Sequence, residues 1–126
     1  MPITQTTTLP ASAAQLTLPT PTTPLYLIFI ASEDPSTGQP WCSDVRAALP
    51  SITTIFSAPS APHLGVVEVG QKPAWKEVAN VYRMDWGVRA IPTLVRYELS
   101  DGVVTEVARL VEGELLDRGK IAGLLG

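Results

Sequence analysis

Hydrophobic residues are continuous over residues 25–31, and a second mostly apolar stretch covers residues 64–69. A short apolar run bounded by prolines and a loop is typical of a central strand buried on both faces. Residues 93–99 and 103–111 also have strand patterns, and Ser100-Asp101-Gly102 between them is a hairpin signal. The chain therefore has four predicted core strands, the last two forming an antiparallel hairpin.

Three other segments carry apolar residues at helical spacing. The first runs from residue 42 to about residue 55, and Pro50 inside it is expected to kink or end the helix. A second helix is predicted from near Pro73 to Tyr82, and a closing amphipathic helix from Glu114, which two glycines weaken. The apolar positions are Val45, Ala48, Leu49 and Ile52 in the first helix and Trp75, Val78, Ala79 and Tyr82 in the second.

Residues 1–24 are rich in Thr, Pro and Ala and hold five of the twelve prolines. Within them, residues 3–9 fit an edge strand and a loose tail equally well. Strands separated by helices are expected to pair in parallel through right-handed crossovers. We therefore expect one α/β domain over residues 1–126, with a mixed sheet of four to five strands and helices on both faces.

Composition and charge bear on which partners the protein binds and in which compartment it is located. The chain has 126 residues, 45% of them hydrophobic, and a net charge of -3 with scattered Lys and Arg, so no basic stripe favours nucleic acid or an anionic membrane. No apolar run approaches the roughly 20 residues of a spanning helix. Because the first Lys or Arg is Arg46, no cationic targeting segment precedes an apolar one. We expect a cytoplasmic protein.

Cys42 is the only cysteine and stands where a loop gives way to the first predicted helix. Composition alone favours a small buried side chain, since free cysteine is among the most buried residue types. Its position favours chemistry, because ligand sites gather at the carboxyl ends of α/β strands and free N–H groups at a helix start favour a thiolate. The negative charge of Asp44 opposes that effect.

Other polar residues carry weaker signals. His63, the only histidine, lies near a strand start far in sequence from Cys42, so a surface or capping role is favoured over a Cys–His pair. Glu33 and Asp34 fit an exposed, solvated loop better than a pair that steers substrates. A single cysteine excludes an intramolecular disulfide and an all-thiolate metal site. No metal and no bound cofactor are predicted.

Four segments resemble thioredoxin-like proteins of the small cytosolic thioredoxin-related type, the Clot group. They are Trp41-Cys42-x-Asp44, the run Val69-Gly70-Gln71-Lys72-Pro73-Ala74-Trp75-Lys76, the run Val88-Arg89-Ala90-Ile91-Pro92-Thr93-Leu94, and the long loop of residues 32–40. The resemblance covers roughly residues 25–111. It implies a thioredoxin fold and thiol–disulfide chemistry on protein or small-molecule disulfides.

The resemblance also implies roles for individual residues. Cys42 matches the attacking nucleophile, and Pro92 matches a cis-proline that presents the backbone of Ile91 to substrate. Trp41 matches the flanking aromatic, as a substrate platform or simply a core residue, and Asp44 matches the acid between the two family cysteines. Ser43 replaces the common proline, and Val45 occupies the position of the resolving cysteine. The family pattern breaks at Val45.

One thiol can form a mixed disulfide, but a second thiolate must attack that bond to release the product. The first hypothesis is therefore a monothiol oxidoreductase that borrows an external thiol such as glutathione. It would act through Cys42 on disulfide, glutathionylated or persulfide substrates. The second hypothesis is a redox-inactive binding or adaptor module that kept the fold and lost the dithiol cycle. The third is a Cys42-linked dimer of a chain otherwise expected to be a monomer.

Overall fold

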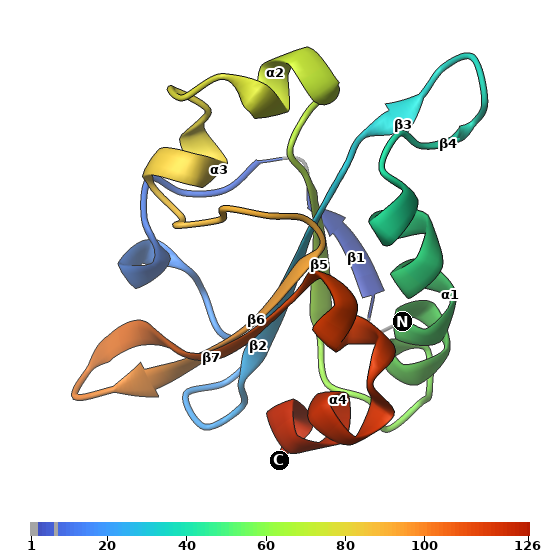
Figure 1. The fold of residues 1–126 in the computed structure, drawn as a ribbon. Coiled ribbons are helices and arrows are strands. Elements are labelled where there is room, and N and C mark those ends of the chain that lie inside the picture. The colour runs from blue at the N-terminus through green and yellow to red at the C-terminus, as the bar shows by residue number, and fades with distance from the viewer. Residues whose placement is uncertain (1–2, 7) are drawn as a thin grey trace.

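The protein, described here by a computed structural model, has a five-stranded sheet in the order β1-β5-β2-β6-β7 (Figure 1). The structure describes residues 3–6 and 8–126; residues 1, 2 and 7 of the predicted N-terminal segment lie outside it. Helices α1 and α4 lie on one side of the sheet in Figure 1, and α3 and the 3-10 turn η1 (Ala13–Gln15) lie on the other. The predicted mixed sheet with helices on both faces is therefore confirmed.

Strand β2 (Leu25–Ile30) is the central strand, as its continuous apolar run predicts. It pairs in parallel with β5 (Leu64–Glu68) on one side and antiparallel with β6 (Thr93–Ser100) on the other. The expectation that every helix-separated strand pairs in parallel was wrong for β6. The sequence between β5 and β6 does not return the chain to the starting end of the sheet, so β6 runs back along β2.

The two sheet edges are β1 (Ile3–Thr6) and β7 (Val103–Val111). The edge-strand alternative for the N-terminal segment is therefore the one observed, and β1 pairs in parallel with β5. Strands β6 and β7 form the predicted hairpin, whose two-residue turn is Asp101-Gly102. Both turn residues have positive φ, 52° and 80°, which the twist of a tight hairpin requires and which Asp-Gly supplies readily.

Helix α1 (Ser43–Phe56) continues through Pro50, so of the two expected outcomes, a kink or an end, the helix end does not occur. Four buried residues at helical spacing hold the helix on the sheet before and after the proline: Val45, Ala48, Ile52 and Phe56. Burying each large apolar side chain stabilises by about 1.5–3 kcal/mol, which together exceeds the roughly 3 kcal/mol that an interior proline costs. Pro50 itself lies on the exposed side.

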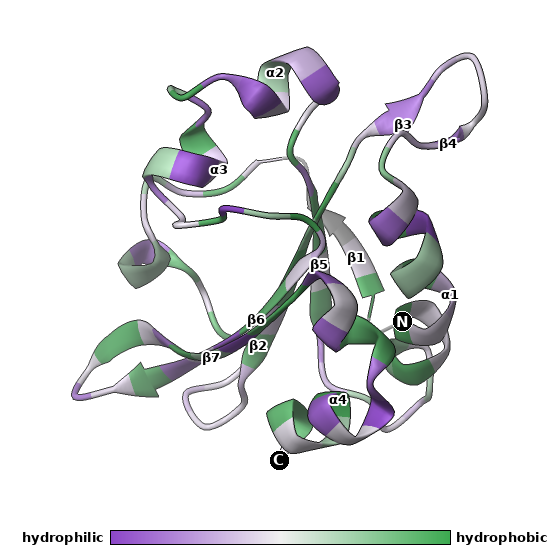
Figure 2. Cartoon of the chain, viewed as in Figure 1, coloured by the Kyte–Doolittle hydropathy of each residue, from purple (hydrophilic) through white to green (hydrophobic). Residues whose placement is uncertain are grey.

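Alternate residues of β2 serve two separate halves of the core. Tyr26 faces α1, with its ring centroid 5.6 Å from that of Phe56. Phe29 points to the opposite side, where its ring lies 6.2 Å from both Tyr82 and Trp86. The strand is therefore buried on both faces, and Figure 2 shows the hydrophobic residues along the centre of the sheet.

The predicted single helix from Pro73 to Tyr82 is two helices in the structure, α2 (Lys72–Lys76) and α3 (Val81–Met84). The backbone becomes extended at Glu77, and Val78 is 86% exposed instead of lying on a shared apolar face. Asn80 explains the break, because its side chain caps the start of α3 by accepting a bond from Tyr82 N at 2.9 Å. Its amide also donates to the carbonyls of Val69 and Ala74.

Replacing Asn80 by alanine is expected to lower the free energy of unfolding by about 1–2 kcal/mol, because one helix cap and two donated bonds are lost together. Urea unfolding followed by circular dichroism measures the change. The matched control is Asn80→Asp, which keeps the cap but donates nothing to the two carbonyls. An N80D protein as stable as the wild type would show that the donated bonds contribute nothing.

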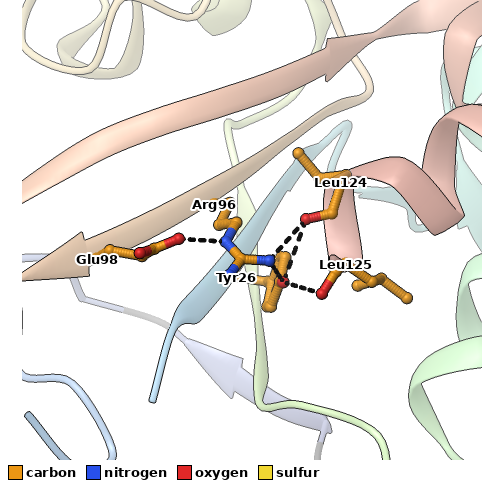
Figure 3. Close-up of polar contacts among 5 residues, drawn as sticks. All are labelled: Tyr26, Arg96, Glu98, Leu124 and Leu125. Atoms are coloured by element: carbon orange, nitrogen blue, oxygen red, sulfur yellow. Dashed lines mark hydrogen bonds and ion pairs between the residues drawn. The ribbon is translucent and has the colours of Figure 1, made fainter. Parts of the chain in front are cut away.

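The chain ends in a 3-10 turn, η2 (Glu112–Leu116), and helix α4 (Arg118–Leu125). Figure 3 shows how α4 is held: the Tyr26 hydroxyl donates to the carbonyls of Leu124 and Leu125, and Arg96 donates to Leu124 O at 2.9 Å. Burial raises the pKa of Tyr26, and the nearby Arg96 guanidinium opposes that effect. The phenol therefore stays a neutral donor at physiological pH.

Candidate functional site

The site predicted from the sequence gathers at one end of the sheet. Val69 N donates to Ile30 O at 2.9 Å, so the chain leaves β2 and β5 side by side. Phe29 pairs with Thr93, which places the start of β6 at the same end. Ligand sites of α/β sheets form where such strand ends leave a crevice between diverging loops.

The loop of residues 32–40 folds into a small hairpin that sequence patterns did not predict. Strands β3 (Glu33–Asp34) and β4 (Gln39–Pro40) pair antiparallel, and Gly38 adopts φ +70° in the turn. The hairpin returns the chain to its starting point, because Trp41 N donates to Ser32 O at 3.3 Å. The Trp-Cys motif is thereby held beside the end of β2.

Gly70 joins the Trp-Cys motif to the longest family-like run. Its carbonyl accepts bonds from Ser32 N at 3.2 Å and from the Trp41 indole N–H at 2.9 Å, while its own N–H donates to Ser32 Oγ. The backbone φ is +106°, and an added Cβ would lie 3.2 Å from the Ala74 Cβ. Glycine is therefore required where the two motifs meet, a role that spacing in the sequence did not reveal.

Cys42 is half-buried and is the N-cap residue of α1. Its backbone is extended, its carbonyl accepts the first helical bond from Arg46 N at 3.1 Å, and its side chain makes no capping bond. The fully buried alternative from composition therefore does not describe this thiol. The next two residues, Ser43 and Asp44, are exposed on the first turn.

Val45 is 0% exposed and packs in the core one turn after Cys42. Its aliphatic side chain has no donor, acceptor or nucleophile, so the position that would resolve a mixed disulfide is chemically inert. The residue that replaces the resolving cysteine is therefore also part of the hydrophobic core.

The segment before β6 supplies the remaining predicted residues. Ile91 is 5% exposed, Pro92 is buried, and the peptide bond between them is cis. The Pro92 carbonyl accepts a bond from Glu112 N at 2.8 Å, and Thr93 Oγ1 donates to Ala90 O at 2.6 Å. These bonds fix the segment at the same sheet end as the Trp-Cys motif.

The weaker candidates lie elsewhere or have other partners. His63 sits at the opposite end of the sheet, where its carbonyl accepts from Tyr26 N at the start of β2. Asp34 accepts from Ser36 N at 2.9 Å and Ser36 Oγ at 2.8 Å, and these bonds hold the pKa of its carboxyl below the usual value. Neither residue joins the Cys42 site.

Two kinds of feature are absent from residues 3–6 and 8–126. No cluster of three or more His, Cys, Asp or Glu side chains in this part of the chain could hold a metal ion. Within the same ranges, no helix has the length and apolar character needed to cross a membrane.

The fold and the Trp-Cys position define a thioredoxin-fold protein. Solved thioredoxins share the architecture: that of Plasmodium falciparum matches with a TM-score of 0.57 over 84% of this chain and 74% of its own, at 12% identity. Thioredoxin f2 of Chlamydomonas reinhardtii matches with a TM-score of 0.56 over 89% and 81%, at 15% identity. Identities this low concern the fold alone.

More specifically, the chain belongs to the thioredoxin domain-containing protein 17-like family, whose thioredoxin-domain model matches residues 11–118. A thioredoxin domain-containing protein of Schizosaccharomyces pombe is 37% identical over 78% of this chain and 79% of its own. Human thioredoxin domain-containing protein 17 is 31% identical over 73% and 69%. The thioredoxin-like protein Clot of Arabidopsis thaliana is 36% identical over 58% and 57%. The predicted resemblance is confirmed.

Proposed function

We propose that this protein is a monothiol thiol–disulfide oxidoreductase that works through Cys42. The observation that carries the proposal is a half-buried thiol at the N-cap of α1 whose side chain is not used as a cap. A partly exposed cysteine beside free N–H groups of a helix start is the environment in which reactive thiolates occur. The fully buried Val45 explains why the cycle would need a second, external thiol.

The reaction begins when the Cys42 thiolate attacks one sulfur of a substrate disulfide. A bond forms between Cys42 Sγ and that sulfur, the substrate S–S bond breaks, and the second sulfur leaves as a thiolate that takes a proton from water. A glutathione thiolate then attacks the mixed disulfide, and a second glutathione completes the reduction. Over one cycle, two glutathione molecules are oxidised to their disulfide and one substrate disulfide becomes two thiols.

Substrates in this proposal are protein or small-molecule disulfides, glutathionylated thiols and persulfides, and no cofactor stays bound. The reaction requires a reducing compartment, so we place it in the cytoplasm. Trp41 and the backbone around Ile91 and Pro92 are the proposed substrate contacts. They share one sheet end with Cys42, and Gly70 holds the Trp41 indole in place.

The rival function is a binding or adaptor module without redox activity. The observation that favours it is again Val45, because the core packs an inert side chain where dithiol enzymes carry their second sulfur. In that case Cys42 would be a relic, or a site of slow adduct formation or of a disulfide-linked dimer. The rates of exchange at Cys42 distinguish these roles.

The test is turnover of bis(2-hydroxyethyl) disulfide, which is small and uncharged, with glutathione present. We expect the wild-type protein to accelerate reduction above the uncatalysed rate and Cys42→Ser to show only that background rate. A non-reducing gel run in parallel measures the Cys42-linked dimer. Equal rates for wild type and C42S would remove the oxidoreductase proposal and leave the adaptor.

A further inference from the structure

A groove runs along α1 from the turn that follows Cys42. It has a volume of about 630 Å³ and is lined by Gln39, Pro40, Arg46, Leu49, Pro50 and Thr53. Strand β4 forms one wall and the exposed side of α1 forms the other, opposite the buried face that packs on the sheet. We call it the α1 groove.

Helix geometry places the thiol position one turn before the α1 groove, whose lining begins at Arg46 on α1. Arg46, Leu49 and Thr53 recur every three or four residues, so they lie on one side of the helix, and Cys42 stands one turn ahead of Arg46 at the head of that stripe. Asp44 lies two residues from Arg46 and therefore faces away from it. A substrate joined to Cys42 meets Arg46 first and the apolar residues next.

Charge in the α1 groove has one sign. Arg46 is the only charged lining residue, and it is bound through Nη1 to the Pro40 carbonyl at 2.6 Å, which fixes the guanidinium against β4. Three ion pairs occur among the described residues, and Arg46 belongs to none of them. Glu33 and Asp34 of the β3–β4 hairpin do not line the groove, and the Asp34 carboxylate accepts a hydrogen bond from Ser36. A carboxylate is therefore the complementary partner for Arg46.

The distances along α1 determine which residues of a bound peptide meet Arg46 and Leu49. Helix rise places Arg46 about 6 Å and Leu49 about 10 Å along α1 from Cys42, and an extended peptide rises about 3.3 Å per residue. The second residue from the substrate cysteine therefore reaches Arg46, and the third or fourth reaches Leu49 and Pro50.

We propose that the α1 groove binds a peptide segment of the disulfide substrate, with an acidic residue two positions from the substrate cysteine and apolar residues just beyond it. This inference rests on the proposed function, because the substrate must first react at Cys42. It adds what that function leaves open, namely which sequences around a target disulfide are selected. The groove contacts the substrate peptide along α1, and the exchange reaction at Cys42 is the one described above.

The experiment uses disulfide-linked dimers of the peptide Leu-Leu-Glu-Gly-Cys-Gly-Glu-Leu-Leu, whose symmetry makes chain direction irrelevant. A second peptide has Gln for Glu, and a third exchanges each Glu with the outermost Leu. Intact-mass spectrometry without glutathione gives the rate at which Cys42 acquires each peptide. The proteins are wild type, Arg46→Gln, and the matched control Arg118→Gln, which removes an equal charge from the exposed start of α4.

We expect wild type and R118Q to prefer the acidic peptide over its glutamine counterpart about three- to fivefold at low salt, and R46Q to lose that preference. The peptide with displaced glutamates should react like the glutamine peptide. An unchanged preference in R46Q, or equal rates for the two acidic peptides, overturns the groove proposal. If Cys42 also fails to react with bis(2-hydroxyethyl) disulfide, the proposed function itself fails and the groove proposal fails with it.

Discussion

Replacing Val45 by cysteine is expected to give a protein that resolves its own mixed disulfide. Residues three apart on a helix lie on one face with Cβ atoms about 5–6 Å apart, and a disulfide needs about 3.5–4.5 Å, so a small shift of the first turn of α1 brings the two sulfurs together. Wild type should release one thiol per substrate disulfide and keep the adduct, whereas V45C should release two thiols and form an internal disulfide. We expect the adduct lifetime to fall at least about a hundredfold, because the second attack becomes intramolecular.

Thiol release in a single turnover without glutathione, together with intact mass, measures this change. Val45→Ala is the matched control, since it disturbs the same buried position without adding a sulfur. V45A should therefore release one thiol, as wild type does. A V45C protein that stops at one thiol with a stable adduct would show that the buried side of α1 cannot deliver a nucleophile to Cys42.

The largest expected loss of stability follows from replacing Phe29 by alanine. Phe29 is 0% exposed and contacts both Tyr82 and Trp86, which come from the segment on the far side of the sheet from α1. Removing a buried phenyl ring from a close-packed core costs about 3–5 kcal/mol, because the cavity is filled only in part. Urea unfolding monitored by circular dichroism and by tryptophan fluorescence should report the same shift.

The control for Phe29 is Val107→Ala on the edge strand β7, where the side chain is 47% exposed. A surface truncation of this kind should change the free energy of unfolding by less than about 0.5 kcal/mol. If F29A were as stable as V107A, the aromatic cluster would not connect α3 to the sheet.

Patterns that depend on local composition were readable from the sequence. The apolar run at β2, the Asp-Gly turn before β7 and the helix start at Cys42 all appear within a residue or two of the predicted bounds. Each has a local cause, namely burial on both faces, positive φ at the turn residues, or apolar residues at helical spacing.

Features that depend on contacts between distant parts of the chain could not be predicted from the sequence. Pro50 was expected to kink or end α1, but the helix does not end there, because burial of residues on both sides of it outweighs its local cost. The break between α2 and α3 depends on Asn80, whose amide reaches the Val69 carbonyl across a loop. The antiparallel direction of β6 is likewise set by the whole sheet and not by its own residues.

The residues of the candidate site also differ in whether local sequence or distant contacts determine their roles. Cys42 and its neighbours were identified as candidates from their motif, because a cysteine at a predicted helix start is visible in the local sequence. The roles of Gly70 and Arg46 were missed, since one joins two segments 29 residues apart and the other lines a groove that exists only when β4 lies beside α1.

The strand order also determines when the sheet can assemble during synthesis. Ile3 pairs with Leu64, about 60 residues later, and β5 is also the parallel neighbour of β2. At roughly 5–20 residues per second, both earlier strands leave the ribosome seconds before their shared partner. The apolar segment of β2 is then an unpaired nascent chain, which is the form that chaperones bind. The apolar segment of β2 therefore stays unpaired with β5 until β5 has been synthesised.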